Sequence, residues 1–112
     1  MTTLRNSVQL IGRLGNSPET TTFGENKTKV RFSFATSDNY KDKDGERVEE
    51  TQWHNIIAWG GIATIAEKYL KKGQEVALSG KITYRSWDDK DGNKKYITEI
   101  VANEIVMFEK KN

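Results

Sequence analysis

The sequence contains no cysteine, which excludes disulfide bonds and metal sites built on thiolates. It contains a single histidine, His54, and a single proline, Pro18. One histidine without cysteine supplies neither a catalytic triad nor a zinc site. No apolar run approaches the about 20 residues of a membrane-spanning helix, and the N-terminal residues lack the apolar core of a signal peptide. We therefore expect a cytoplasmic protein, without a metal or other cofactor, that is not an enzyme.

The charge is nearly balanced overall but unevenly distributed. The chain has 112 residues, which predicts one domain over residues 1–112, and a formal net charge of +2. Nine of the sixteen carboxylates fall in residues 38–50 and 88–95, which we expect to be loops. The remaining strands and helix are then basic, as a nucleic-acid partner requires. The alternative that these loops are merely solvated stays open on charge alone.

Alternation of apolar and polar residues predicts five strands. Between the third and fourth, Ile62, Ile65, Ala66, Tyr69 and Leu70 recur at helical spacing. Residues 15–27 are expected to form a loop or loose hairpin. Five strands with one helix between the third and fourth are the arrangement of an all-β, five-stranded OB-fold barrel. The predicted strands are residues 5–14, 28–37, 51–59, 75–87 and 96–107.

The aromatic residues of the third strand carry the strongest functional signal. Because side chains alternate between the two faces of a strand, Trp53, Asn55, Ile57 and Trp59 share one face. His54 lies on the opposite face with core-forming residues, so we expect it to be partly buried and hydrogen-bonded. The two indoles are then left on a face that need not belong to the core.

The fourth strand repeats this pattern with positive charge added. One face of this strand carries Lys81, Thr83, Arg85 and Trp87. Phe32 and Phe34 of the second strand are assigned to the core. Rings interleaved with cations suit single-stranded nucleic acid, because bases stack on aromatic side chains and phosphates attract Lys and Arg. The predicted DNA-binding residues include Arg31 of the second strand and, more weakly, Tyr40.

Two acidic segments resemble calcium loops only superficially. Residues 42–45 and 89–92 both have the sequence Asp-Lys-Asp-Gly, but Tyr40 and Trp87 occupy the first ligand position. Turn formation is the favoured interpretation of both segments.

Taken together, the motifs resemble those of the bacterial single-stranded DNA-binding proteins from about Asn6 to Met107. The matching segments are residues 8–19, 34–37, 50–55, 59–60, 66–73 and 80–87. The resemblance implies binding of single-stranded DNA without sequence preference, in support of DNA replication, recombination and repair. It also implies a homotetramer, a dimer of dimers, located in the cytoplasm with the nucleoid.

The resemblance also assigns individual residues. The stacking positions of the family fall on Trp53, Trp59 and Trp87, and a fourth, often tryptophan, falls on Tyr40. Family cations fall on Lys72 and Arg85, and the basic start falls on Arg5. Asn55 and Thr83 stand where cations are common in the family, so fewer phosphate contacts are expected.

The end of the chain departs from the family pattern. Members usually continue into a linker and an acidic tail that recruits replication and repair enzymes, whereas residues 108–112 are basic. Recruitment through such a tail is therefore not expected from this chain. Three other interpretations stay open: a tailless primosome-type OB protein, a carbohydrate-binding OB module, and an assembly subunit with its indoles buried between protomers.

Overall fold

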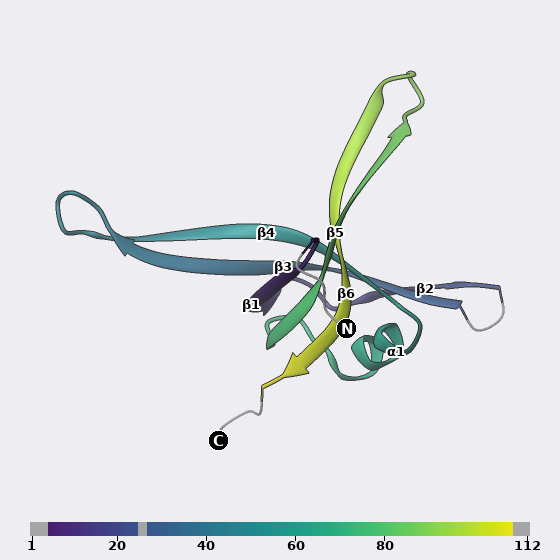
Figure 1. The fold of residues 1–112 in the computed structure, drawn as a ribbon, viewed down its shortest axis with the longest axis horizontal. Coiled ribbons are helices and arrows are strands. Elements are labelled where there is room, and N and C mark those ends of the chain that lie inside the picture. The colour runs from purple at the N-terminus through teal and green to yellow at the C-terminus, as the bar shows by residue number, and fades with distance from the viewer. Residues whose placement is uncertain (1–4, 25–26, 109–112) are drawn as a thin grey trace.

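Residues 5–24 and 27–108, which the computed structural model describes, form six strands and one helix (Figure 1). In chain order these elements are β1 (Val8–Leu14), β2 (Glu19–Phe23), β3 (Lys27–Lys41), β4 (Arg47–Trp59), α1 (Gly60–Tyr69), β5 (Glu75–Asp88) and β6 (Lys94–Met107). The tail prediction concerned residues 108–112, of which 109–112 lie outside the described residues. No helix in the described ranges has the length and apolar character needed to span a bilayer.

The strands form one sheet that closes on itself. Their order is β1-β5-β6-β4-β3-β2, and an additional pairing of β1 with β3 completes a five-stranded barrel. The predicted OB-fold barrel is thus confirmed. The helix follows the fourth strand of the chain rather than the third, because Glu19–Phe23 pairs with the start of β3 as an additional strand. Three consecutive threonines favour this extended conformation, since β-branched residues are common in strands.

The core lies inside the barrel and beneath α1. Phe32 and Phe34 are fully buried, as predicted, with their rings at 6.3 Å in an edge-to-face arrangement. The helix buries Ala63 and Ala66, whereas Ile65 and Tyr69 are exposed. Of the apolar residues that recur at helical spacing, Ile65 and Tyr69 therefore lie outside the buried face of the helix, which its small alanines form.

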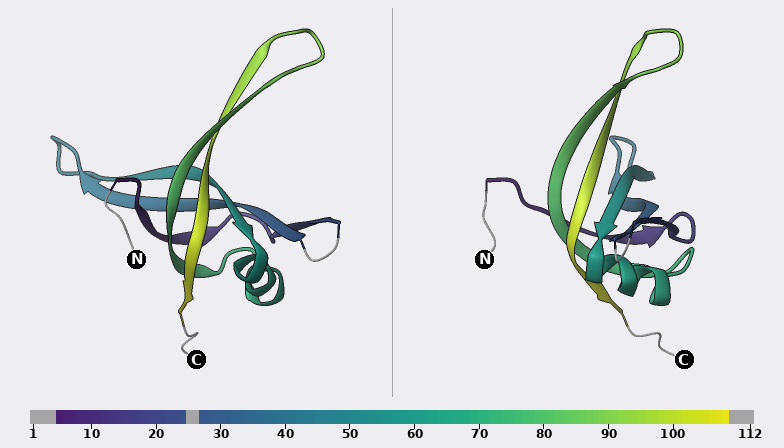
Figure 2. Two further views of the ribbon diagram at one scale, coloured as in Figure 1. Left: turned by 45° about the vertical axis from the view of Figure 1, so that its right-hand side comes forward. Right: turned by 90° about the vertical axis from the view of Figure 1, so that its right-hand side faces the viewer.

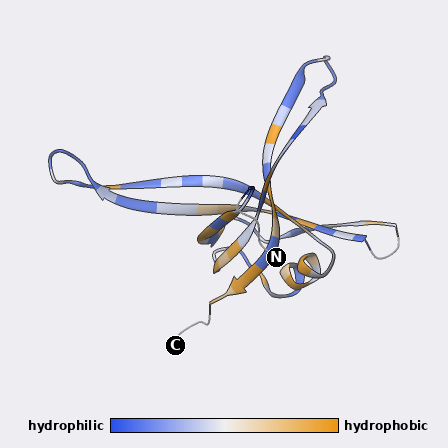
Figure 3. Ribbon diagram, viewed as in Figure 1, coloured by the Kyte–Doolittle hydropathy of each residue, from blue (hydrophilic) through white to orange (hydrophobic). Residues whose placement is uncertain are grey.

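Three hairpins extend beyond the barrel in the described part of the chain (Figures 1 and 2). The predicted loop over residues 38–50 is mostly strand, since the β3–β4 ladder continues to the pair Lys41–Arg47. Tyr84 alternates with Thr83 and Arg85 and so continues the inward side of β5, but it is 79% exposed because β5 has left the barrel at that point. The projecting arms are largely hydrophilic and the apolar residues concentrate in the barrel and helix (Figure 3).

The β3–β4 and β5–β6 arms end in turns of the same design. The Asp42 carboxylate accepts hydrogen bonds from the backbone N–H groups of Asp44 and Glu46, both at 2.9 Å. Asp89 does the same for the backbone of Asp91 and Asn93, at 3.0 and 2.8 Å. The prediction of turn chemistry for the two Asp-Lys-Asp-Gly segments is confirmed.

A close approach between strands explains Gly80. The β5–β6 register shifts between Ser79 and Gly80, as in a β-bulge. A Cβ atom at Gly80 would stand 2.2 Å from the carbonyl oxygen of Val101. Glycine is therefore required where the barrel turns into the arm.

Candidate nucleic-acid interface

The odd-numbered residues of β3, of β4, of β5 from Lys81 onward and of β6 up to Val101 lie on one continuous outer surface of the sheet, which we call the tryptophan face. The ladders align Arg31 with Ile57, Ile57 with Val101, and Val101 with Lys81. The next row is Ser33, Asn55, Glu99 and Thr83. Strand alternation then places Trp53, Trp59, Arg85 and Trp87 on the same surface. The structure thus brings together predicted residues from three strands.

Trp53 is the most exposed of the three indoles, at 64%. It lies beside Ala35 in the ladder and against the loop that follows β1. A Cβ atom at Gly15 would stand 2.5 Å from Cζ3 of Trp53 and 2.6 Å from Oγ of Ser33. The backbone N–H of Gly15 donates to the carbonyl of Ser33 at 2.9 Å, which holds this loop in place. Gly15 therefore provides the space that the indole ring occupies.

Trp59 ends β4 and is 47% exposed. Lys29, its ladder partner on β3, places Nζ 5.3 Å from the centre of the indole. The ring of Phe23 on β2 lies at 6.1 Å from that of Trp59, tilted by 33°. The indole thus has an aromatic neighbour and a cation beside it.

Trp87 lies on the β5–β6 arm and is 43% exposed. The guanidinium carbon of Arg85 stands 5.5 Å from its ring centre, within the range of a cation–π contact. Both side chains lie on the tryptophan face. A ring beside a cation suits a ligand in which bases and phosphates alternate.

A buried carboxylate organises the centre of the tryptophan face. Glu99 is 3% exposed and is the one charged residue among the described residues that is buried. Arg85 donates two hydrogen bonds to it, from Nε at 3.2 Å and from Nη2 at 3.1 Å, and Nη2 of Arg31 lies at 3.5 Å. The hydrogen bonding and the negative charge of Glu99 raise the pKa of Arg85, which stays cationic. Two guanidinium groups thus face one carboxylate, a formal net charge of +1.

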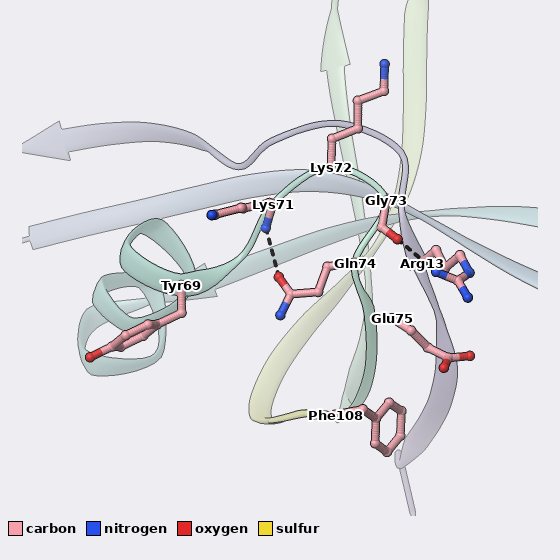
Figure 4. Close-up of a pocket in the computed structure, with 8 residues that line it drawn as sticks. All are labelled: Arg13, Tyr69, Lys71, Lys72, Gly73, Gln74, Glu75 and Phe108. Carbon is pink, nitrogen blue, oxygen red and sulfur yellow. Dashed lines mark hydrogen bonds between the residues drawn. The ribbon is translucent and has the colours of Figure 1, made fainter. Parts of the chain in front are cut away.

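Lys72 lies in the connection between α1 and β5 and lines a pocket there. Figure 4 shows this pocket, in which Arg13 donates to the carbonyl of Gly73 at 3.0 Å. The N–H of Gly73 donates to the carbonyl of Leu14, the residue before Gly15. This connection is thereby attached to the loop that supports Trp53. The other lining residues are Tyr69, Lys71, Gln74, Glu75 and Phe108.

Arg5 lies beside β5. The side chain of its neighbour Asn6 makes two hydrogen bonds of 2.9 Å with the backbone of Ile82. These bonds fix the chain next to Lys81, which is exposed on the tryptophan face.

Tyr40 lies farther away, on the β3–β4 arm, opposite Val48 and 51% exposed. Because side chains alternate along β3, Tyr40 lies on the same face of the sheet as Thr36 and on the opposite face from Ala35 and Trp53. A strand of DNA touching both Tyr40 and Trp53 has to pass around the arm.

His54 is half-buried and lies with its Nε2 3.0 Å from Oγ1 of Thr36, as expected for a satisfied histidine. Desolvation by burial lowers its pKa, so the ring is neutral at pH 7. It faces away from the tryptophan face and contributes no charge there.

Sequence reasoning missed Glu99, Lys29 and Phe23. Glu99 interrupts the apolar outward positions Ile97 and Val101, and this interruption was an available signal. Phe23 was hidden in a predicted loop, although the three threonines before it favour a strand.

The Single-strand binding protein family model matches residues 5–108, nearly the whole chain. The chain belongs to this family. A relative named single-stranded DNA-binding protein 1 from Chlorobaculum tepidum is 48% identical over 104 residues, covering 92% of this chain and 64% of the relative. Its namesake from Xylella fastidiosa is 44% identical over 107 residues, covering 95% of this chain and 79% of that one. The chain thus spans less than two thirds of the Chlorobaculum protein.

A solved structure supports the same membership in the Single-strand binding protein family. The structure described as Plasmodium falciparum SSB complex with ssDNA superposes with a TM-score of 0.86 at 28% identity. The match covers 97% of this chain and 99% of that one.

Proposed function

We propose that this domain binds single-stranded DNA without sequence preference, as a binding module and not as an enzyme. The observation that carries the proposal is the tryptophan face, where three exposed indoles and several cations occupy one surface of the barrel. Bases of any identity stack on indoles, and phosphates are attracted by Lys and Arg. The solved relative whose description names ssDNA has the same fold over 97% of this chain.

Each predicted site residue has a role in this proposal. Trp53, Trp59 and Trp87 stack on bases, with Tyr40 as a fourth ring on the arm. Lys81 and Arg85 contact phosphates on the face itself. Further phosphate contacts come from Arg31, Lys72 and Arg5.

The decisive experiment is a tryptophan-fluorescence titration with polythymidylate at two salt concentrations. We expect quenching, because bases cover exposed indoles, and an affinity that falls as salt rises, because phosphate contacts release counterions. Salt-independent binding would favour the carbohydrate-binding alternative, and unquenched indoles would favour burial between protomers.

We further propose that the protein acts as a homotetramer in the cytoplasm, associated with the nucleoid, in DNA replication, recombination and repair. Family membership supports the assembly and the roles. Light scattering on the purified protein tests the assembly, and a monomer mass at micromolar concentration would contradict it.

A further inference from the structure

The tryptophan face continues beyond β4 onto the β2–β3 hairpin. In the ladders, Trp59 pairs with Lys29, Lys29 pairs with Thr21, and Phe23 pairs with Lys27. Directly paired residues of antiparallel strands lie on the same face. Phe23, Lys27 and Lys29 therefore share the surface of Trp59, although β2 takes no part in closing the barrel.

The ring of Phe23 is open to solvent on this surface. Its side chain is 45% exposed, and Trp59 beside it is 47% exposed. The distance of 6.1 Å between the ring centres leaves no room for a base between them, since an inserted ring needs about 3.5 Å on each side. A base can stack only on the outward side of Phe23.

The charges around Phe23 repeat the pattern of the rest of the face. Lys29 lies 5.3 Å from the Trp59 ring, as Arg85 lies 5.5 Å from that of Trp87. Lys27 is exposed directly opposite Phe23. An exposed aromatic with one cation directly opposite it and a second diagonally across the strand pair suits one base and its adjoining phosphates.

We propose that Phe23, Lys27 and Lys29 form an additional DNA subsite that extends the bound strand from Trp59 along the β2–β3 hairpin. This subsite rests on the proposed function of the domain. Phe23 stacks on a base of its own, and the two lysines contact the flanking phosphates.

The test compares Phe23→Ala, Phe23→Leu and Phe23→Tyr by anisotropy of a labelled thymidylate oligonucleotide. Loss of a stacking ring weakens binding by about fivefold or more, so Ala and Leu should bind equally weakly and Tyr should bind like the parent. If Leu binds like the parent, Phe23 only supports Trp59 through packing, and the subsite is refuted. Parent-like binding by Ala refutes it as well. Ile65→Ala, which shortens a similarly exposed apolar side chain on α1, is the matched control.

Photocrosslinking gives a second measurement that does not depend on folding of a variant. Irradiation of the parent complex with oligonucleotides carrying 5-iodouracil should link a base to the peptide containing Phe23. No such link, with links found at the tryptophans, overturns the subsite while leaving the proposed function intact. Absence of any DNA binding by the parent overturns the proposed function itself.

The lysines are tested through the salt dependence of binding. Lys27→Gln and Lys29→Gln should each reduce the slope of log affinity against log salt by about 0.7, the value for one phosphate of a single strand. Lys68→Gln on α1 is the control and should leave the slope unchanged. Slopes equal to that of the parent for both hairpin variants would refute the phosphate contacts.

Discussion

The carboxylate of Glu99 accepts two hydrogen bonds from the guanidinium of Arg85, at 3.2 and 3.1 Å, in the middle of a surface that we propose binds an anion. A buried acid at this position repels phosphate, but it also fixes the direction of the arginine. The planar pair restricts Arg85 to one orientation, with its guanidinium near the ring of Trp87. Glu99 thus weakens the attraction of this surface for DNA but fixes the orientation of Arg85.

Replacing Glu99 by Gln separates these two effects. Gln keeps an oxygen that accepts a hydrogen bond from Arg85 but removes the negative charge, so Arg31 and Arg85 present a larger net positive charge. We expect tighter binding of polythymidylate at low salt and a steeper salt dependence, by up to about 0.7 in slope. Titrations at several salt concentrations measure both quantities.

The control for this substitution is Glu104→Gln, which makes the same change of charge on the same strand beside Ser79. It should alter the slope less than Glu99→Gln. Weaker binding of a folded Glu99→Gln variant would show that the carboxylate, rather than a neutral acceptor, is needed to orient the arginines.

Truncating the indoles should weaken DNA binding without unfolding the protein. Trp53→Ala, Trp59→Ala and Trp87→Ala should each cost about 1–3 kcal/mol of binding free energy, the range for loss of a base stack. All three side chains are more than 40% exposed, so little core packing is lost. Binding titrations and thermal unfolding report the two effects separately, and parent-like affinity of Trp53→Ala would refute its assignment. His54→Ala, from the opposite face, should affect stability more than affinity.

Adding one methyl group at Gly15 should disturb DNA binding through Trp53. The new Cβ atom would overlap Cζ3 of Trp53 and Oγ of Ser33, so the indole must move. We expect Gly15→Ala to bind polythymidylate more weakly and to show altered tryptophan fluorescence before DNA is added. Gly61→Ala is the matched control because its Cβ atom meets nothing within 4 Å. Unchanged fluorescence and affinity for Gly15→Ala would contradict this account of the loop.

The lowered pKa of His54 predicts a dependence of stability on pH. In the unfolded chain the histidine titrates near its ordinary value of about 6.5, whereas burial lowers the pKa in the folded protein. As the pH falls below about 6.5, the unfolded state takes up the proton first. The free energy of unfolding should therefore be greatest above that pH and decrease as the pH falls through the folded pKa. Urea unfolding of the parent and of His54→Gln, compared at several pH values between about 8 and 5.5, should show a smaller decrease for the variant.

Features that depend on local alternation were predicted from the sequence. The exposure of Trp53 and Trp59, the burial of Phe32 and Phe34, and the half-buried state of His54 all follow from a period of two along one strand. The barrel was predicted from the order of the strands and the helix, although its closure depends on pairings between residues far apart in the sequence.

Features that depend on where strands leave the barrel were not predicted. Residues 38–50 are charged enough to suggest a loop, but in an arm both faces of the ribbon are solvated, so charged residues can continue the ladder. For the same reason Tyr84 is exposed even though its position continues the inward pattern of β5. The pairing of Glu99 with Arg31 and Arg85 depends on the registers of β3, β4, β5 and β6, which no local pattern reveals.

The turns at Asp42 and Asp89 do not depend on the length of the arms that they close. Because each turn is closed by its own hydrogen bonds, inserting two residues into each strand of an arm should lengthen it by about 7 Å and keep every side chain on its face. A one-residue insertion in each strand would instead exchange the two faces beyond it. The length of an arm can thus change while the barrel, its core and its register remain the same.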